Sequence, residues 1–281
     1  MVLRNLRFET LTAVFNKNLN DFIKLLELSK EMGLTIFRLG SNFIPFASHP
    51  AFRPEWFKVM EEKLKYVADV VRNYCIRITM HPDQFVVLNS PKDDVVQRSL
   101  AELKYHFWVL DTLKLGDDSV VVIHVGGVYG DKKSAIKRLE ETLNENTWLK
   151  KRLAIENDEK YYTIDDVIQL VETYGIPAVF DYYHHILNPS NFSLDKLLHT
   201  WGKRIPEIHI SSKPEGSHRF GEHGDYINVS DFKNMISMFG VDFHTDVIIE
   251  AKKKEKAVSR LLQELKHEGI PIRTTPLKCP A

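Results

Sequence analysis

The sequence has little of what marks proteins of specialised environments. It has two cysteines, Cys75 and Cys279, in 281 residues. Two thiols so far apart are too few and too badly placed for a disulfide framework, which favours a reducing cytoplasm. No apolar run approaches the ~20 residues that a membrane span needs. The first residues include Arg4 and Arg7 but no apolar stretch of a signal peptide. We therefore expect a cytoplasmic protein with no membrane partner.

Net charge is also absent, because 38 basic residues balance 38 acidic ones. A protein without a global positive excess has no general attraction to polyanions, so a nucleic-acid partner would be bound by a local patch. No Ser-, Gly- or Pro-rich linker and no shift in composition divides the chain. We expect residues 1–281 to form a single domain that works as a monomer without an obligate protein partner.

Short apolar runs alternate with amphipathic helical stretches along the whole chain. The runs are 35–39, 76–81, 120–124, 153–156, 178–181, 207–209 and 247–250. The helical stretches are 19–30, 55–71, 94–114, 132–150, 163–174, 192–202, 230–239 and 255–268. Apolar runs of this length are typical of buried parallel strands, and their alternation with helices indicates an α/β fold. The fold class that fits is a (β/α)8 TIM barrel.

An eight-stranded barrel needs one more strand, which would come before the helix at 19–30. Residues 2–8 are a candidate, but Arg4 and Arg7 make them a poor buried strand. We favour the alternative, in which the chain lacks the first strand of the barrel.

Six of the seven runs end in, or next to, a side chain of a type that binds metals. These residues are His81, His124, Glu156, Asp181, His209 and Glu250. A lone histidine at a strand end is more often structural, and a lone buried acid is usually a cap or an ion-pair partner. In a barrel, however, all strands deliver their last residues to one face. Several buried carboxylates there need compensating charge, which cations supply. The pattern predicts a metal site.

Two loop histidines extend this ligand set. His184 follows Asp181 by three residues, and His223 lies in a polar loop where Gly221 and Gly224 let the backbone fold inward. Eight ligands are too many for one ion and suit two or three divalent ions. Such a cluster can generate hydroxide at neutral pH and neutralise an attacked phosphate. Mixed imidazole and carboxylate ligands admit Mn²⁺ or Zn²⁺.

Three segments of the chain resemble the UV damage endonucleases, repair enzymes related in fold to endonuclease IV. The segments are 37–50, 81–90 and 246–252, and the resemblance extends over nearly the whole chain from about residue 16. It implies a TIM barrel and about three divalent ions, with Mn²⁺ first and Zn²⁺ or Co²⁺ as alternatives. All eight ligands named above match the family's metal ligands. The family's opening strand, with its Gly-Tyr pair, is not visible in this sequence.

The resemblance also implies catalytic and DNA-contacting residues. Glu156, Glu250 and Glu207 are the expected catalytic carboxylates. Glu207 stands where the family leads us to expect a carbamylated lysine near the metals, and its carboxylate is a functional substitute for that group. Gln84 matches a glutamine that probes the duplex at the lesion. Phe85 replaces the usual tyrosine and can still wedge into the base stack. Apart from the resemblance, the candidate phosphate contacts are His49, Arg53, Lys132, Lys133, Lys252 and Lys254. For each lysine taken alone, a solvated helix face is an equal alternative.

By this resemblance the protein would nick UV-damaged double-stranded DNA 5′ to pyrimidine dimers and 6-4 photoproducts. Abasic sites would be a further substrate, and the products would be a 3′-hydroxyl and a 5′-phosphate. Three alternatives stay open. An endonuclease IV-like abasic-site enzyme has an Asp-x-His ligand pair, which Gly221-Glu222-His223 lacks. A sugar isomerase or epimerase of the same superfamily would leave Gln84 and Phe85 without a role. A metal-dependent DNA-binding protein without activity is the third.

Overall fold

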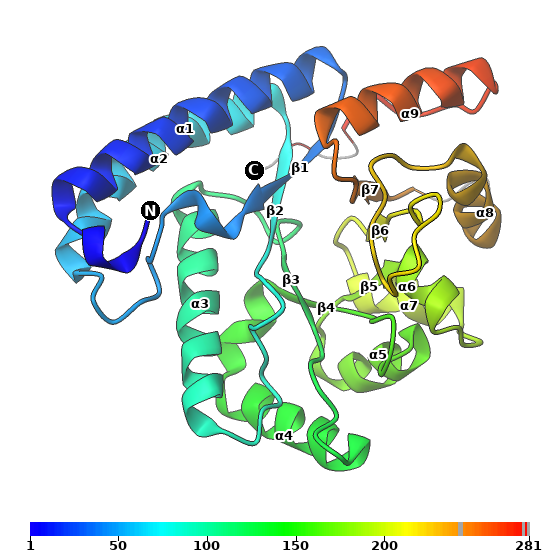
Figure 1. The fold of residues 1–281 in the computed structure, drawn as a ribbon, viewed down its shortest axis with the longest axis horizontal. Coiled ribbons are helices and arrows are strands. Elements are labelled where there is room, and N and C mark those ends of the chain that lie inside the picture. Colours follow the sequence, from blue (N-terminus) through cyan, green and yellow to red (C-terminus); the bar gives the residue numbers. More distant parts are fainter. Residues whose placement is uncertain (241–243, 277–278, 280–281) are drawn as a thin grey trace. The chain divides into compact units, whose positions relative to one another are not determined.

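The computed structural model describes residues 1–240, 244–276 and 279 (Figure 1). The chain divides into two compact units. The first unit spans Met1–Leu153 and includes Cys279. The second begins at Ala154 and contains the rest of the described chain. The expectation of a single domain stays a prediction.

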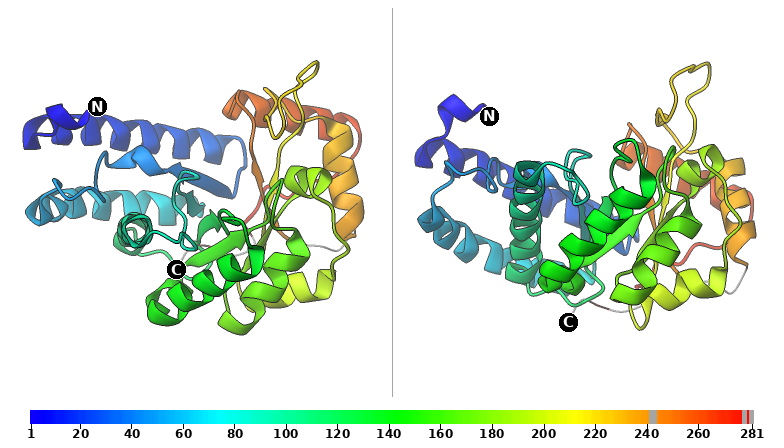
Figure 2. Two further views of the ribbon diagram at one scale, coloured as in Figure 1. Left: turned by 60° about the horizontal axis from the view of Figure 1, so that its bottom comes forward. Right: turned by 90° about the horizontal axis from the view of Figure 1, so that it is seen from below.

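The first unit contains three parallel strands with helices between them. In sequence order its elements are η1 (Leu3–Asn5), α1 (Phe8–Glu31), β1 (Ile36–Gly40), η2 (Ser41–Phe43), α2 (Pro54–Tyr74), β2 (Arg77–His81), α3 (Asp93–Thr112), β3 (Val121–His124), α4 (Lys132–Glu145) and η3 (Thr147–Lys151). The strands pair in the order β1-β2-β3. The long helices α1 and α2 lie side by side (Figures 1 and 2).

Helix α1 starts earlier than predicted. Its buried face begins with Leu11 and Phe15 and continues through Leu19 and Phe22 at spacings of three and four residues. This is one continuous apolar stripe, so the helix forms from Phe8 rather than from residue 19. Residues 2–8 form no strand in the described chain, and the prediction that they are a poor strand is confirmed.

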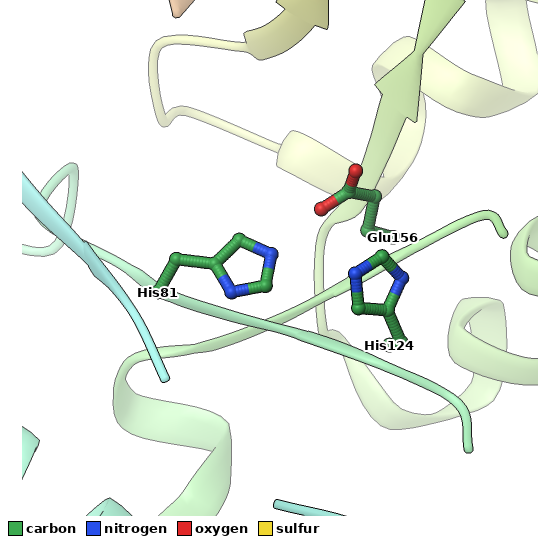
Figure 3. A group of neighbouring side chains, drawn as sticks. All are labelled: His81, His124 and Glu156. Carbon is green, nitrogen blue, oxygen red and sulfur yellow. The ribbon is translucent and has the colours of Figure 1, made fainter. Parts of the chain in front are cut away.

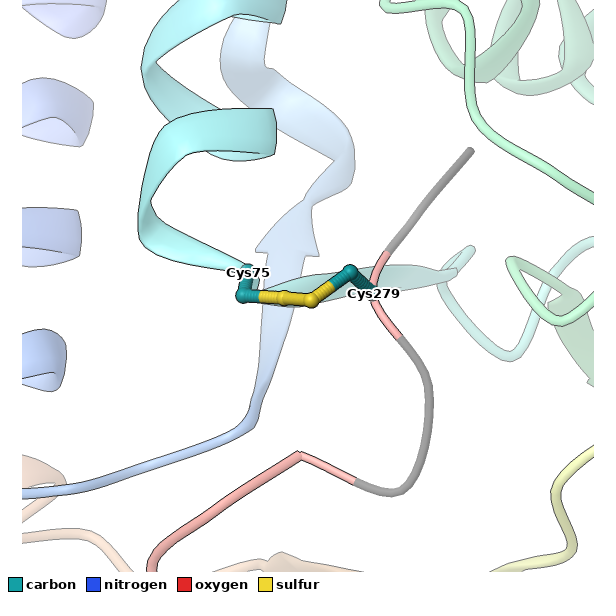
Figure 4. Close-up of a disulfide and its surroundings, with 2 residues drawn as sticks. All are labelled: Cys75 and Cys279. Atoms are coloured by element: carbon teal, nitrogen blue, oxygen red, sulfur yellow. A yellow bond between two sulfur atoms is a disulfide. The ribbon is translucent and has the colours of Figure 1, made fainter.

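The two cysteines, which the sequence analysis takes as too few and too badly placed for a disulfide framework, pair with each other. Helix α2 starts with Pro54, whose fixed φ suits a first turn, and ends at Cys75 in the left-handed conformation (φ 57°). Cys75 forms a disulfide with Cys279 of the C-terminal tail, across a sequence separation of 204 residues (Figure 4). The large separation of the two cysteines in sequence therefore did not indicate that they are far apart in the fold. The pairing also removes one support for the expected cytoplasmic location.

The second unit contains four parallel strands. Its elements are β4 (Leu153–Glu156, which starts at the boundary), α5 (Ile164–Val171), η4 (Glu172–Tyr174), β5 (Ala178–Asp181), α6 (Tyr182–Leu187), α7 (Leu194–Trp201), β6 (Glu207–Ile210), α8 (Val229–Phe239), β7 (Asp246–Ile249) and α9 (Glu255–His267). The strands pair in the order β4-β5-β6-β7. All seven apolar runs of the sequence are therefore strands, each within one residue of the predicted ends.

Local capping explains two helix starts in this unit. The side chain of Thr163 accepts a hydrogen bond from the backbone of Asp166, whose carboxylate accepts one from the backbone of Thr163, a reciprocal capping box at α5. Asp181 accepts from the backbone N–H of His184 and so begins the short helix α6. The sequence analysis did not predict α6, because Asp181 was interpreted only as a metal ligand at the end of a strand and not also as a helix cap. Among the described residues, no helix is long and apolar enough to span a membrane.

Candidate metal centre

The strand register places predicted ligands of the second unit on one face of its sheet. Asp181 at the end of β5 is the direct register partner of His209 on β6, and His209 pairs with Ile248 on β7. Side chains two residues apart on a strand share a face, so Glu250, two residues after Ile248, follows the same side. Parallel strands in register thus bring residues together that are distant in sequence.

Glu156, Asp181 and His184 form a buried group that could hold a metal ion. They offer ligand atoms that all lie within 4.8 Å of one another. The Nδ1 atom of His184 lies 3.4 Å from a carboxylate oxygen of Glu156 and 3.7 Å from one of Asp181. The same Nδ1 is 2.9 Å from the backbone carbonyl of Asn157. Asn157 also accepts from the backbone N–H of Asp181 at 2.8 Å, which fixes the end of β5.

His209 sits among three carboxylates. Its Nε2 lies 2.9 Å from Glu207, and its Nδ1 lies 3.0 Å from Glu156 and 3.6 Å from Glu250. His209 and Glu207 are completely or almost completely buried. If Nε2–H donates to Glu207, the lone pair of Nδ1 faces the other two acids. A carboxylate behind a histidine in this way orients the ring for a metal.

The loop between β6 and α8 brings His223 to the same acids. Its Nδ1 is 3.5 Å from Glu250, and its ring centroid is 6.3 Å from that of His184. Gly221 has φ +69°, and a Cβ on Gly224 would come within 2.9 Å of the backbone oxygen of Ser212. The two glycines are therefore needed for this loop to fold as it does, as the sequence suggested.

Burial and charge shift the pKa values of this group. Burial raises the pKa of Asp181 to about 7, although the neighbouring His184 opposes the rise. Burial alone would lower the pKa of His184, but attraction to Asp181 and a hydrogen bond with Glu156 raise it to about 11. Both shifts follow from closely spaced carboxylates in a buried place.

The residues fit divalent cations. Oδ2 of Asp181 is buried and has no hydrogen-bond partner among the described residues. Glu156, Asp181 and Glu207 have at most 1% of their surface exposed. Burying this much negative charge is costly unless positive charge compensates it. Imidazole nitrogens and carboxylate oxygens are the donor set that Mn²⁺ and Zn²⁺ accept.

Two further predicted ligands belong to the first unit. Gly40 pairs with His81 at the end of β1 and β2, and the ring centroids of His81 and His124 are 5.2 Å apart (Figure 3). Nδ1 of His81 lies 2.8 Å from the carbonyl oxygen of Pro82. Since a carbonyl only accepts, Nδ1 carries the proton in this hydrogen bond, and Nε2 keeps the lone pair that a metal needs.

The loop between β2 and α3 exposes the predicted DNA probes. Gln84 and Phe85 are exposed, and Phe85 keeps 70% of its surface accessible. The next residues anchor the loop, because Val86 and Leu88 are buried and the backbone N–H of Val87 donates to Ser99. The aromatic ring thus stands on a fixed support.

The predicted phosphate contacts differ in their surroundings. Arg53 is exposed before α2 and lies over the ring of Trp56, while His49 accepts a hydrogen bond from the backbone of Ala51. Lys252 pairs with Glu222 at 2.7 Å. Lys254 is exposed at the start of α9. Lys132 and Lys133 open α4, where Asp131 caps the helix. None of them is buried.

Sequence reasoning missed two residues beside the second-unit cluster. Asn157 follows Glu156 directly and bonds both Asp181 and His184. Glu159 lies 3.8 Å from Nε2 of His184. Both residues lie in the polar stretch that directly follows a strand ending in a predicted ligand. Only the residues at the strand ends were considered as candidates in the sequence.

Known proteins are similar to this chain along most of their length. The model of the family described as UV-endonuclease UvdE matches residues 3–275. A UV DNA damage endonuclease of Bacillus velezensis is 33% identical over 272 residues, which are 93% of this chain and 84% of the relative. One of Bacillus cereus is 32% identical over 267 residues, 92% of this chain and 84% of the relative.

Solved structures agree with the predicted fold class. The crystal structure of SacUVDE has a TM-score of 0.87 at 33% identity, with 96% of this chain and 93% of that one covered. A D-psicose 3-epimerase from Clostridium cellulolyticum H10 has a TM-score of 0.57 at 14% identity, with coverage of 90% and 94%. The second likeness shows the fold alone. The fold is an α/β TIM barrel.

Proposed function

Because the chain belongs to the UV-endonuclease UvdE family, we propose that it is a metal-dependent repair enzyme that cuts duplex DNA 5′ to UV photoproducts. Its substrates would be pyrimidine dimers, 6-4 photoproducts and abasic sites, and its products a 3′-hydroxyl and a 5′-phosphate. The observation that supports this best is the buried group of Glu156, Asp181 and His184. A buried acid and imidazole cluster in this family is suited to hydrolysing a phosphodiester.

We propose that the eight predicted ligands hold about three divalent ions, Mn²⁺ first. They are His81, His124, Glu156, Asp181, His184, His209, His223 and Glu250. When bound, such ions activate water and neutralise charge on the attacked phosphate. Glu156 and Glu250 are the acids nearest to Nδ1 of His209, which suits them to bridging roles. Glu207 bonds the other nitrogen of that ring, so we assign it a positioning role.

Damage recognition is proposed for the loop with Gln84 and Phe85. An exposed ring on an anchored loop can enter the base stack where a photoproduct has already weakened it, which lowers the cost of extruding the damaged bases. Phe85 has no hydroxyl group, so it acts by shape and stacking. His49, Arg53, Lys132, Lys133, Lys252 and Lys254 are proposed phosphate contacts, which position a duplex without reading its sequence.

Two of the alternatives are weaker on specific observations. The position two before His223 is Gly221, so the Asp-x-His pair expected of an endonuclease IV-like enzyme is absent from this loop. The epimerase neighbour shares 14% of its sequence with this chain. A sugar-converting enzyme has no use for an exposed aromatic ring on the β2–α3 loop. A metal-dependent DNA-binding protein without activity would also use the buried acid cluster to hold metal, so the cleavage assay and not the cluster separates it from the proposed enzyme.

One assay tests the proposal. Purified full-length protein is incubated with UV-irradiated, abasic and undamaged duplexes, with Mn²⁺ or after chelation. We expect nicks immediately 5′ to photoproducts that a polymerase can extend from the 3′-hydroxyl, and no nicks after chelation. Glu156→Gln should lower the rate by about 10³-fold, the order that several kcal/mol of lost metal stabilisation implies.

The outcomes separate the candidates. Cleavage of abasic DNA alone would favour the endonuclease IV-like alternative. Sugar turnover without DNA cleavage would favour an isomerase or epimerase. Damage-dependent DNA binding that persists without any cleavage would favour the inactive binding protein.

We also propose a cytoplasmic monomer. Access to chromosomal DNA supports this location, whereas the Cys75–Cys279 disulfide calls for an explanation there. Mass measurement in solution and blocking of free thiols in intact cells before lysis would test both points. A stable dimer, or a disulfide formed solely after export, would contradict the proposal.

A further inference from the structure

Glu159 occupies a place that the predicted ligand set does not explain. It lies in the segment between β4 and α5, three residues beyond Glu156. Its Oε2 is 3.8 Å from Nε2 of His184. Its Oε1 packs toward the backbone of Gly221, because a Cβ placed there would meet Oε1 at 3.6 Å. The carboxylate therefore lies between the imidazole of His184 and the loop that contains His223.

The hydrogen bonding of His184 selects which nitrogen faces a metal. Nδ1 lies 2.9 Å from the backbone carbonyl of Asn157. A carbonyl only accepts, so Nδ1 donates, and the lone pair of the neutral ring is on Nε2. Nδ1 is the nitrogen that approaches Glu156 and Asp181. Nε2 is the nitrogen that approaches Glu159.

The 3.8 Å separation fits a shared ion better than a direct contact. It is too long for a hydrogen bond between nitrogen and oxygen. Two atoms that each lie ~2.1 Å from one ion can be at most about 4.2 Å apart. The pair is therefore already within the range of two ligands on one divalent ion.

A second acid in the same region has different partners. Glu222 precedes His223, but its carboxylate pairs with Lys252 at 2.7 Å and accepts from the hydroxyl of Ser217 at 2.5 Å. In the part of the chain that the structure describes, Glu159 forms no ion pair with a lysine or arginine; it attracts the neighbouring Lys160 electrostatically and lies 3.8 Å from Nε2 of His184. The acid that can serve an ion beside His184 is thus Glu159.

We propose that Glu159 is a metal ligand, and that it holds one divalent ion together with Nε2 of His184. With Nδ1 bonded to Asn157, His184 offers Nε2 to this ion. The buried group of Glu156, Asp181 and His184 would then serve two ions, one between the two acids and one at Nε2 of His184. The inference deepens the proposed metal-dependent function and rests on it. It adds a ninth ligand to the predicted eight.

Metal content tests the assignment without relying on DNA cleavage. Full-length wild type, Glu159→Gln and His184→Ala are loaded with Mn²⁺, desalted and analysed by elemental mass spectrometry. Titration of free Mn²⁺ followed by electron paramagnetic resonance gives the affinity of each site. We expect each variant to retain one ion fewer than wild type, or to bind its weakest ion at least tenfold less tightly.

The double variant separates a shared ion from two independent effects. Glu159→Gln with His184→Ala should lose the same single ion as either change alone, because both ligands serve one site. Glu172→Gln removes the same charge from an exposed position of this unit and should retain every ion. Circular dichroism checks that each variant is folded. Glu159→Asp, which keeps a carboxylate, should recover part of the binding.

Each outcome bears on a stated claim. Wild-type stoichiometry and affinity in Glu159→Gln overturn the inference while the proposed function stands. Loss of two ions in the double variant also overturns it, because the two side chains then serve different sites. If the wild type binds no divalent ion, the proposed metal-dependent function fails together with the inference.

Discussion

The acid and imidazole cluster of the second unit and the β2–α3 loop of the first unit depart from ordinary protein surfaces in opposite ways. The cluster buries charged side chains, with Glu156 and Asp181 almost completely inaccessible. The loop exposes a large apolar ring, with 70% of Phe85 accessible. Folded proteins usually expose charged side chains and bury large apolar ones. The comparison suggests that each departure marks one half of the proposed activity.

The physical reason for each departure is different. Buried charges interact strongly because little water screens them, so ions and acids act on a phosphate most effectively there. An aromatic ring that enters a base stack must be exposed on the protein surface, and the loop that holds it must be rigid. Buried Val86 and Leu88 supply that support. Chemistry favours the interior, and recognition favours the surface.

The largest effect that sharpens this comparison is expected at Glu207. Glu207→Ala removes the oxygen that lies 2.9 Å from Nε2 of His209, and metal affinity should fall about 10- to 100-fold, as for other residues that orient a ligand. Glu207→Gln keeps an acceptor oxygen and should lose less. Calorimetric Mn²⁺ titration gives both values. If both variants instead lose one whole ion, Glu207 is itself a ligand.

A smaller effect is expected at the exposed loop. Phe85→Ala should weaken binding to UV-damaged duplex about tenfold, the order expected for one lost base–aromatic stack of ~1–3 kcal/mol. Metal content should not change. Fluorescence anisotropy with damaged and undamaged duplexes measures the effect. Tyr66→Ala removes another exposed ring, on α2, and should leave binding intact. Equal losses in the two variants would refute a specific role for Phe85.

A last prediction concerns folding stability and not metal or DNA binding, and it tests whether every buried polar side chain is functional. His106 is fully buried, and burial lowers its pKa to about 4 even though a hydrogen bond to the carbonyl of Glu102 opposes this. The unfolded chain, with a histidine pKa near ~6.5, binds the proton more readily. The native state should therefore lose up to about 3 kcal/mol as the pH falls from about 6.5 to about 4.

Urea unfolding of wild type and His106→Gln across this pH range checks that sign. The variant should lose less stability on acidification than wild type, because its side chain does not titrate. Since other groups titrate identically in both proteins, the difference between the two profiles isolates His106. Parallel profiles would mean that His106 does not contribute to the acid sensitivity.

The strands and several candidate ligands were predictable because they depend on local patterns. An apolar run that ends in Glu156 or Asp181 predicts both a buried strand and a candidate ligand at the end of that strand. The start of α1, the helix α6 and the role of Asn157 were not predictable in this way. Asp181 is both a helix cap and a candidate ligand. The sequence alone does not reveal that one residue has both roles. Glu159 needed the side-chain geometry, since its spacing from Glu156 alone is equally typical of a solvated loop.

The Cys75–Cys279 disulfide turns most of the polypeptide into a covalent ring. All eight predicted ligands lie between the two cysteines in sequence, whereas His49 and Arg53 lie in the N-terminal segment before Cys75, outside the ring. A protease that cuts once inside the ring leaves a single molecule of unchanged mass apart from one added water. Two fragments separate when the disulfide is reduced. Comparison of the nicked protein on reducing and non-reducing gels would reveal the ring directly. The segments that contain the predicted ligands would stay covalently joined after a single cut that would separate them in a chain without the disulfide.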